Sequence, residues 1–509
     1  MAVEAPYGSW KSPLSSDIVS GASKAWAGMC MDKTQPDAIT WAEMRPSEGG
    51  RTIVMSCNML EDNTATQWTK HDDFSAYNKV HEYGGASFAC HKGNLYFSNQ
   101  SDQKIYRQRG ADSTPEPVTD GPEGYYRYAD FNFVANSLIC VREDHGPVKQ
   151  GQAKDPDNTI IALDLSTKKE TVLCSGYDFY AYPRVSPDGS KLAWMQWKFP
   201  NMPWDDTEIW LADFYVNDGL VSLTNHRQVC GEVGVNYMEP RWTSDGKLCF
   251  ISDKTGWWNL YLVENLDTLQ CKNVCPMDVE IGSPCWKFGH LSYAPHPSNP
   301  DVIAVLYGGK PALLTVSSVQ LQSIDIGDMQ CSEVLFGQEG KYLVLVCFGS
   351  NVPCTVYRYD FNSNKLNSVY QLSDLPVEDG YFSRPEEITF PTDDGKAVAH
   401  AYYYPPKNKD YIGTKGTLPP CLVCLHGGPT ASASKALSLN KQYYTSRGFA
   451  VLDVNYRGST GYGTAFRNAL RLKWGEYDIQ DACAGALYLA EKGLVDGQKL
   501  TITGGSAGR

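Results

Sequence analysis

The sequence predicts a seven-bladed β-propeller followed by part of a doubly wound α/β domain with a mostly parallel sheet. Three observations support this prediction. Short strand-like segments separated by turn residues recur over residues 21–380. Near residue 385 the pattern changes to continuous apolar segments that alternate with helical ones. With 509 residues, the chain is also too long for one ordinary domain.

The repeat is clearest where turn residues precede an alternating apolar strand. Asp188-Gly189 and Asp245-Gly246 are such turns, because glycine accepts a positive φ and aspartate bonds its own backbone. Weaker units begin near residues 37, 93, 136, 301 and 340. A spacing of roughly 40–57 residues is typical of propeller blades. A pair of all-β sandwiches is the alternative, but the long and regular period favours the propeller.

Segment 381–509 begins with a hairpin pattern near residues 388–404 and then follows α/β rules. Apolar runs at 421–425, 449–454 and 500–502 predict strands that are buried on both faces. Helical patterns at 435–446, 464–472 and 479–492 alternate with them. We therefore expect an N-terminal segment over 1–20, a candidate to pack on the α/β part, then a propeller over 21–380 and the α/β domain over 381–509.

Composition narrows the classes of partner. The net charge of −13 and the isoelectric point near 5.2 argue against nucleic acid or an anionic membrane as the main partner. The first residues carry neither the basic nor the apolar region of a signal peptide. No run reaches the roughly 18 apolar residues that span a bilayer. A cytoplasmic location is the resulting expectation.

The 16 cysteines are scattered, and we expect them to be reduced and mostly buried. Two pairs have spacings that invite a metal interpretation. Cys421 and Cys424 lie on a predicted strand, where a spacing of three sends the thiols to opposite faces. Cys271 and Cys275 have no matching second pair. We therefore predict no metal site.

A candidate nucleophile follows the last predicted strand. The motif G-x-S-x-G on a strand end is the nucleophile elbow of α/β-hydrolases, and the α/β domain is accordingly predicted to be the first half of that fold. A tight turn would hold the serine hydroxyl out of the sheet, and close approach requires small neighbours. The segment that carries this pattern reads Gly504-Gly505-Ser506-Ala507-Gly508, with Ser506 as the nucleophile.

A second motif, His426-Gly427-Gly428-Pro429, follows the strand at 421–425. In α/β-hydrolases this position carries the loop that donates N–H groups to the oxyanion. The backbone N–H groups of Gly428 and Ala507 are our candidates. His426 is not expected to be the general base, because the catalytic histidine of this fold follows the serine.

A third glycine-rich segment occupies residues 455–463, after the next strand. It lacks the lysine of a phosphate-binding loop, so we interpret it as a loop at the rim of the site. The three motifs in this order resemble those of the prolyl oligopeptidase family of serine peptidases, in its acylaminoacyl-peptidase and dipeptidyl-aminopeptidase-like branch. Propeller segments 81–85, 141–145 and 242–261 resemble the same branch. The resemblance implies a seven-bladed propeller capping an α/β-hydrolase domain, with the active site in the cavity between them.

The resemblance also implies a function. It suggests a serine-type peptidase without a cofactor that acts on short peptides from their N-terminus, of acylaminoacyl or dipeptidyl type. A free amino terminus would need a carboxylate in the cavity, and Glu82 and Glu143 are weak candidates because they lie in family-like segments. Each is better explained as a structural ion-pair partner. The sequence leaves self-association open.

Two departures from the family pattern concern the end of the sequence. The family places a glycine where Arg509 stands, and the Asp and His of its triad have no matching positions here. We therefore expect the chain as given to be incomplete and inactive. One alternative is a non-catalytic propeller interaction module with a vestigial hydrolase half. Another is a carboxylesterase that uses the same elbow.

Overall fold

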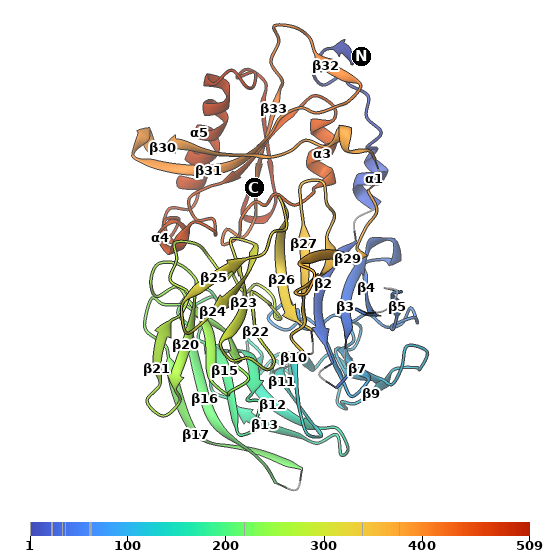
Figure 1. The fold of residues 1–509 in the computed structure, drawn as a ribbon, viewed down its shortest axis with the longest axis vertical. Coiled ribbons are helices and arrows are strands. Elements are labelled where there is room, and N and C mark those ends of the chain that lie inside the picture. Colours follow the sequence, from blue (N-terminus) through green and yellow to red (C-terminus); the bar gives the residue numbers. More distant parts are fainter. Residues whose placement is uncertain are drawn as a thin grey trace.

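A computed structural model describes residues 2–21, 24–32, 34–35, 37–60, 64–217, 219–337, 339–375 and 377–508. Seven four-stranded antiparallel sheets form a ring in the lower part of Figure 1, coloured from blue through green to yellow. A five-stranded sheet with its helices, orange to red, sits on top of the ring. The predicted propeller and α/β-hydrolase fold are confirmed.

Each blade is one antiparallel meander of four consecutive strands. Blade 1 comprises β2 (Ala25–Met31), β3 (Ala38–Arg45), β4 (Arg51–Asn58) and β5 (Thr66–Gln67), and blade 2 comprises β6 (Phe88–His91), β7 (Asn94–Ser98), β8 (Ile105–Gln108) and β9 (Glu116–Pro117). Blade 3 comprises β10 (Tyr126–Val134), β11 (Ser137–Asp144), β12 (Asp157–Asp164) and β13 (Glu170–Cys174). Blade 4 comprises β14 (Phe179–Val185), β15 (Lys191–Trp197), β16 (Glu208–Asn217) and β17 (Leu220–Cys230).

Blade 5 comprises β18 (Tyr237–Trp242), β19 (Leu248–Ser252), β20 (Asn259–Asn265) and β21 (Gln270–Asn273). Blade 6 comprises β22 (Tyr293–Pro295), β23 (Val302–Tyr307), β24 (Lys310–Thr315) and β25 (Gln320–Ser323). Blade 7 comprises β26 (Gln330–Phe336), β27 (Tyr342–Phe348), β28 (Thr355–Asp360) and β29 (Lys365–Gln371). The first strands of most blades contribute residues to a central channel of about 350 Å³. The second strands are almost wholly apolar and buried, because they pack between neighbouring blades.

Acidic side chains on the first strands of blades 3, 5 and 7 link each blade to the next. Each lies at or beside a step in the strand register, where a bulge re-aims the side chain. Asp130 accepts a hydrogen bond from the backbone N–H of Tyr182 at 2.8 Å. Glu239 accepts one from the hydroxyl of Ser292 at 2.6 Å. The third residue, Glu333, links blade 7 to blade 1.

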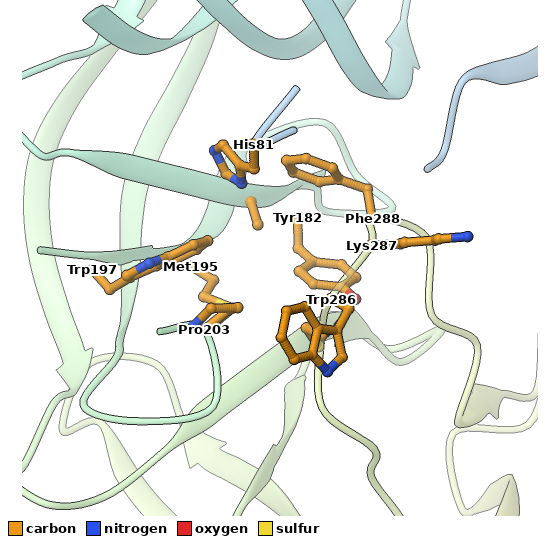
Figure 2. A pocket seen from close by; sticks show the side chains of 10 residues that line it. His81, Tyr182, Met195, Trp197, Pro203, Trp286, Lys287 and Phe288 are labelled. Carbon is orange, nitrogen blue, oxygen red and sulfur yellow. Dashed lines mark hydrogen bonds between the residues drawn. The ribbon is translucent and has the colours of Figure 1, made fainter. Parts of the chain in front are cut away.

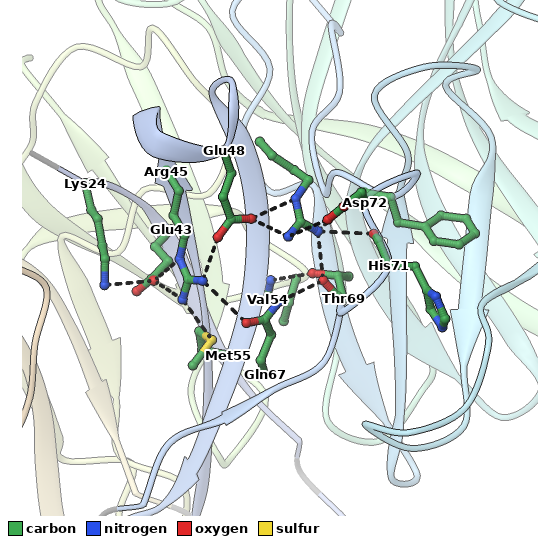
Figure 3. A network of polar contacts seen from close by, with 12 residues as sticks. Lys24, Glu43, Arg45, Glu48, Val54, Met55, Gln67, Thr69, His71 and Asp72 are labelled. Atoms are coloured by element: carbon green, nitrogen blue, oxygen red, sulfur yellow. Dashed lines mark hydrogen bonds and ion pairs between the residues drawn. The ribbon is translucent and has the colours of Figure 1, made fainter. Parts of the chain in front are cut away.

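Within the described residues the ring is closed by side-chain contacts, because every strand of blade 1 comes from the beginning of the propeller and every strand of blade 7 from its end. The indole of Trp26 donates to Glu333 at 2.7 Å, and the Tyr370 hydroxyl donates to Glu43 at 2.9 Å. Glu43 is buried and also binds Arg45, which continues a polar network along blade 1 to Glu48 (Figure 3). A shared apolar cluster completes the closure.

The hydrolase domain is built on a mixed sheet with strand order β30-β31-β34-β33-β35. Strands β33, β34 and β35 are parallel, and β30 and β31 add an antiparallel hairpin. Helix α5 packs on the sheet, and Leu452, Val454 and Leu489 are buried in the core between them. The elements are β30 (Glu386–Thr392), β31 (Ala397–Tyr404), β33 (Cys421–Leu425), α3 (Leu439–Thr445), β34 (Ala450–Asn455), α4 (Gly463–Asn468), α5 (Tyr477–Glu491) and β35 (Leu500–Gly504).

The N-terminal segment lies against the hydrolase domain (Figure 1). Strand β1 (Val3–Ala5) pairs in parallel with β32 (Tyr411–Gly413), and helix α1 (Ser16–Gly21) contacts α3. The short helix α2 (Gly146–Lys149) lies in blade 3. None of the helices in the described ranges has the length and apolar character needed to cross a lipid bilayer.

The two domains are joined by polar contacts across their interface. Arg467 on α4 forms a buried ion pair with Asp253 of blade 5 and lies over the ring of Trp258 at 4.2 Å. The backbone N–H of Thr464 donates to Gly256 O at 2.8 Å. A buried pair of this kind is costly to break from one side, so it fixes how α4 sits on the propeller.

One cysteine prediction is wrong. Cys331 and Cys347 form a disulfide, because the β26–β27 register places them directly opposite each other with Cα atoms 3.9 Å apart. The other cysteines are free. Cys421 packs in the main hydrolase core and Cys424 against a separate cluster on the opposite face, as the strand spacing predicts. Burial raises the pKa of each of these two thiols to about 12.

Candidate active site

Ser506 lies where β35 ends and a short 3-10 turn, Ser506–Gly508, begins. Its φ is 54°, in the left-handed region that residues other than glycine rarely occupy. Such backbone strain costs on the order of 1–3 kcal/mol and concentrates at functional sites. Among the described residues its hydroxyl forms no hydrogen bond. The chain thus holds a serine in a strained turn at the end of a parallel strand.

Close backbone packing explains the glycines on both sides of Ser506. A Cβ atom at Gly504 would lie under 3.0 Å from the carbonyl oxygen of Gly508, a distance that real Cβ atoms essentially never show. At Gly508 it would lie 2.5 Å from the carbonyl oxygen of Leu425 on β33. Gly505 has nothing within 4 Å of that position. Glycine is therefore required at two of the three positions.

The His-Gly-Gly loop touches this elbow. It leaves β33, which is the neighbour of β35 in the sheet. A Cβ atom at Gly427 would lie 3.1 Å from the Cβ of Ser506. Gly428 has a φ of 124°, which favours glycine, and within the described residues its N–H makes no hydrogen bond. The structure thus places Gly427, the neighbour of Gly428, against Ser506.

His426 braces the loop. Its ring stacks on Tyr456 with centroids 4.4 Å apart, and Nε2 lies 2.7 Å from the hydroxyl of Ser459. Nδ1 lies 2.8 Å from the carbonyl oxygen of Gly427. Burial lowers the pKa of the imidazole. Both ring nitrogens are engaged away from Ser506, so the geometry gives His426 a positioning role.

The third glycine-rich segment is anchored by a buried ion pair. Arg457 binds Asp481 on α5 at 2.9 Å, and the backbone N–H of Arg457 donates to the same carboxylate at 2.7 Å. The hydroxyl of Thr392 on β30 adds a third bond at 2.7 Å. Asn455 in turn accepts a bond from the N–H of Ala433, in the extension of the His-Gly-Gly loop. This segment therefore holds the neighbouring loop in position.

Glu82 and Glu143 lie in the propeller and do not line the cavity between the domains. Glu82 is exposed and pairs with Arg127 at 2.7 Å. Glu143 is buried, and it accepts hydrogen bonds from the N–H of His81 at 2.7 Å and from His145 at 3.0 Å. Burial raises the pKa of Glu143, but these histidine contacts outweigh it and lower the value overall. Glu82 and Glu143 thus have the contacts of structural ion-pair partners.

Figure 2 shows an aromatic cluster of the propeller that includes His81, Trp197, Trp286 and Phe288. The ring of His81 contacts two others, with its centroid 4.8 Å from that of Phe288 and 5.4 Å from that of Trp197. The indole N–H of Trp286 donates to the carbonyl oxygen of Thr430 at 2.7 Å. The space left among these side chains is only about 20 Å³, room for a single water molecule. The cluster therefore supports the loop.

A larger cavity of about 450 Å³ lies between the domains. The connection between blades 5 and 6, together with blades 6 and 7, forms one wall, and the hydrolase domain, including residues 432–434 and 460–462, forms the other. Glu280, in the blade 5 to blade 6 connection, faces this space. Sequence reasoning missed Glu280, because a single glutamate in an irregular segment carries no motif.

Comparison with known proteins identifies the family. The structure superposes on a puromycin-hydrolysing peptidase of Mycobacterium tuberculosis with a TM-score of 0.91 and 33% identity, over 99% of this chain and 77% of the other. The chain belongs to the prolyl oligopeptidase family. A family model with that description matches residues 435–508. The family that the three motifs resemble is thereby confirmed.

Curated members of the prolyl oligopeptidase family match shorter segments. Dipeptidyl aminopeptidase BIII of Pseudoxanthomonas mexicana is 28% identical over 192 residues, which are 37% of this chain and 27% of that protein. An acylamino-acid-releasing enzyme of Arabidopsis thaliana is 36% identical over 93 residues, which are 18% and 12% of the two chains. The matched segments thus cover well under half of these relatives.

Proposed function

We propose that the protein is a serine peptidase that removes residues from the N-terminus of short peptides. The names of its relatives, a dipeptidyl aminopeptidase and an acylamino-acid-releasing enzyme, support action at the N-terminus. The single observation that carries the chemistry is the strained φ of Ser506 at the end of β35, in contact with the His-Gly-Gly loop. That combination is what a nucleophile elbow requires.

In the proposed reaction the Ser506 Oγ attacks the scissile carbonyl carbon, and its proton passes to a general base, which in this fold is a histidine that follows the serine. The base returns the proton to the departing amine as the C–N bond breaks, and water then hydrolyses the acyl-enzyme ester. During the attack the carbonyl oxygen becomes negatively charged and accepts hydrogen bonds from the backbone N–H groups of Gly428 and Ala507. Removing one such donor typically slows an acyl-transfer enzyme by about 10²–10³-fold. His426 is not the base in this scheme, because its ring contacts Ser459 and Gly427 O instead.

The architecture supports a limit on substrate size. In the proposed division of the chain, the segment 1–20 packs on the hydrolase domain 381–509, and the propeller 21–380 covers it. A peptide would reach Ser506 through the cavity of about 450 Å³, which excludes folded proteins. A cytoplasmic location remains a prediction, and self-association is left open.

Hydrolysis tests the proposal against the carboxylesterase alternative. Peptide anilides and p-nitrophenyl esters are offered to the intact protein and to its Ser506→Ala variant. We expect anilide hydrolysis that the variant loses, and no cleavage of a folded protein. Ester hydrolysis without anilide hydrolysis would favour the esterase. No Ser506-dependent hydrolysis of either substrate would favour the non-catalytic propeller module.

A further inference from the structure

Three side chains with different metal-binding groups meet in the propeller. They are Glu239 on β18, and Cys285 and His290 in the connection between blades 5 and 6. A carboxylate oxygen, the thiol sulfur and an imidazole nitrogen, one from each residue, all lie within 4.8 Å of one another. The three residues are spread over segment 239–290, so no short cysteine or histidine motif marks them.

The thiol and the imidazole keep lone pairs that a cation can use. The Cys285 sulfur makes weak contacts, with the Met238 sulfur at 3.5 Å, the Tyr182 hydroxyl at 3.6 Å and the carbonyl oxygen of Ser283 at 3.9 Å. Nδ1 of His290 lies 3.0 Å from the Ser283 hydroxyl, and among the described residues the other ring nitrogen forms no hydrogen bond. A partner on one ring nitrogen orients the imidazole and leaves the other nitrogen for a metal.

The carboxylate of Glu239 is held in place and also keeps free lone pairs. It accepts hydrogen bonds from the hydroxyl of Ser292 at 2.6 Å and from its backbone N–H at 3.2 Å. These use two of the roughly four acceptor positions of a carboxylate. Arg241 lies 3.6 Å away, which is longer than the about 2.7–2.9 Å of a charge-assisted hydrogen bond. The arginine therefore balances part of the charge without occupying the remaining positions.

The protonation states suit a divalent cation. Burial, with help from Lys287 and Arg241, lowers the pKa of His290, so the imidazole is neutral, which is the form that binds metals. Burial, with help from Glu239, raises the pKa of the Cys285 thiol, so a metal must displace its proton. One divalent cation, one thiolate and one carboxylate together carry no net charge. A buried site tolerates such a neutral set far better than an isolated charge.

We propose that Glu239, Cys285 and His290 bind one zinc ion. Zinc takes sulfur, nitrogen and oxygen ligands at about 2.0–2.3 Å in tetrahedral geometry, which places two ligands of one ion under about 4 Å apart. Small side-chain rotations bring the three donor atoms to that spacing. The thiolate is a soft ligand, so it favours zinc over the hard cations Mg²⁺ and Ca²⁺. His290 lines the central channel of about 350 Å³, which provides a path for the ion.

Zinc at this site would restrain the segment that supports the His-Gly-Gly loop. Trp286 follows Cys285 directly and donates its indole N–H to the carbonyl oxygen of Thr430 at 2.7 Å. Phe288 lies between the two ligands in the sequence, and its backbone N–H donates to Gly84 O at 2.9 Å. An ion that ties Cys285 and His290 to β18 thus fixes the base of this contact. The proposal does not depend on the peptidase function.

Calorimetric titration with zinc chloride tests the proposal on the protein after dialysis against a chelator. We expect one zinc ion to bind per chain, and Cys285→Ser and His290→Gln each to weaken binding at least tenfold. Cys275→Ser is the matched control, because Cys275 is buried in the same connection but lies outside the cluster, and it should bind zinc as the wild type does. Excess magnesium or calcium chloride should not displace zinc. Absent zinc binding, or binding that both ligand variants retain, would overturn the proposal.

Cobalt chloride gives a readout that needs no variant. The exposed thiols of Cys271 and Cys483 are alkylated first, so that they cannot supply a ligand. We expect the wild-type protein with Co²⁺ to show a sulfur-to-cobalt charge-transfer band and the strong visible bands of four-coordinate cobalt. An equimolar amount of zinc chloride should remove both. Absence of the charge-transfer band, or the weak visible spectrum of six-coordinate cobalt, would overturn the assignment.

Thermal unfolding separates this site from zinc bound elsewhere. Ligands that bind only the folded state raise its stability. Zinc chloride should therefore raise the melting temperature of the wild type and of Cys275→Ser, and leave that of Cys285→Ser unchanged. An equal rise in all three proteins would place the ion on other residues and contradict the proposal.

Discussion

Glycines in the propeller and in the hydrolase elbow serve different purposes. Gly189 and Gly246 sit in hairpin turns with φ values of 74° and 82°, and a Cβ atom at either would meet nothing within 4 Å. Gly504 and Gly508 lie where two strands and a turn approach so closely that a Cβ atom has no room. The propeller turns depend on local conformation, whereas the elbow depends on contact between distant segments. The candidate site should therefore be far less tolerant of substitution than the blades.

The largest effect is expected at Gly504. Gly504→Ala forces a methyl group into the carbonyl oxygen of Gly508, and overpacking of this kind costs about 1–3 kcal/mol or more. We expect the variant to lose reactivity of Ser506 toward a fluorophosphonate. Gly505→Ala is the matched control, because the added methyl meets nothing, and it should react as the wild type does. Equal reactivity of the two variants would contradict the contact argument.

The next effect concerns the buried pair that anchors segment 455–463. Asp481→Asn leaves Arg457 buried without its counter-charge, and breaking such a pair from one side costs about 3–5 kcal/mol. Denaturant unfolding followed by a hydrolase-domain probe measures the loss. The exposed propeller pair of Lys70 and Asp112 provides the control. Asp112→Asn should leave the free energy of unfolding unchanged within error, because exposed ion pairs contribute little to stability. A small effect at Asp481 would show that the segment holds its position by other contacts.

A pH effect of intermediate size involves one glutamate in each region. Burial raises the pKa of Glu280 at the interface, and that of Glu333 in the propeller channel, from 4.5 to about 7. A raised carboxyl pKa stabilises the folded state fully below about pH 4.5, and this contribution is lost as the pH rises through 7. For Glu280 the loss is about 3 kcal/mol.

Urea unfolding at pH 5 and pH 8 checks this expectation. The free energy of unfolding should fall between pH 5 and pH 8. Glu280→Gln, at the interface, and Glu333→Gln, in the propeller, should each make this fall smaller. A fall that both variants retain in full would mean that other groups cause it.

The smallest effect is expected in a blade turn. Gly189→Ala places an alanine at a φ of 74° without any clash, and left-handed backbone costs a residue other than glycine about 1–2 kcal/mol. Thermal unfolding should report a modest loss of stability, with reactivity of Ser506 unchanged. A loss as large as that of Gly504→Ala would remove the distinction between the two kinds of glycine.

The architecture was predictable because its signals are local and repeated. Turn residues such as Asp188-Gly189 mark blades one after another, and apolar runs such as 421–425 mark buried parallel strands. The elbow and the His-Gly-Gly loop could also be predicted from the sequence. Their glycines allow neighbouring backbone segments to approach closely, and such glycines appear in the sequence as motifs. Whether Ser506, Gly428 and Ala507 perform the proposed roles remains a prediction.

What the sequence did not reveal depends on contacts between distant segments. The Cys331–Cys347 disulfide follows from strand register, which no cysteine spacing announces. Asp253 and Arg467 are 214 residues apart and meet only when α4 docks on blade 5. Glu280 becomes noticeable only once it is seen to be buried, unpaired and facing a cavity.

The most direct test of the account is to locate the residue that a fluorophosphonate modifies. The intact protein is treated with the reagent, digested and analysed by mass spectrometry, with Ser506→Ala and Gly505→Ala treated in parallel. The account predicts a single adduct on the peptide that contains Ser506, absent from Ser506→Ala and retained in Gly505→Ala. An adduct on another serine, or none on a folded protein, would contradict the central claim that Ser506 is an activated nucleophile.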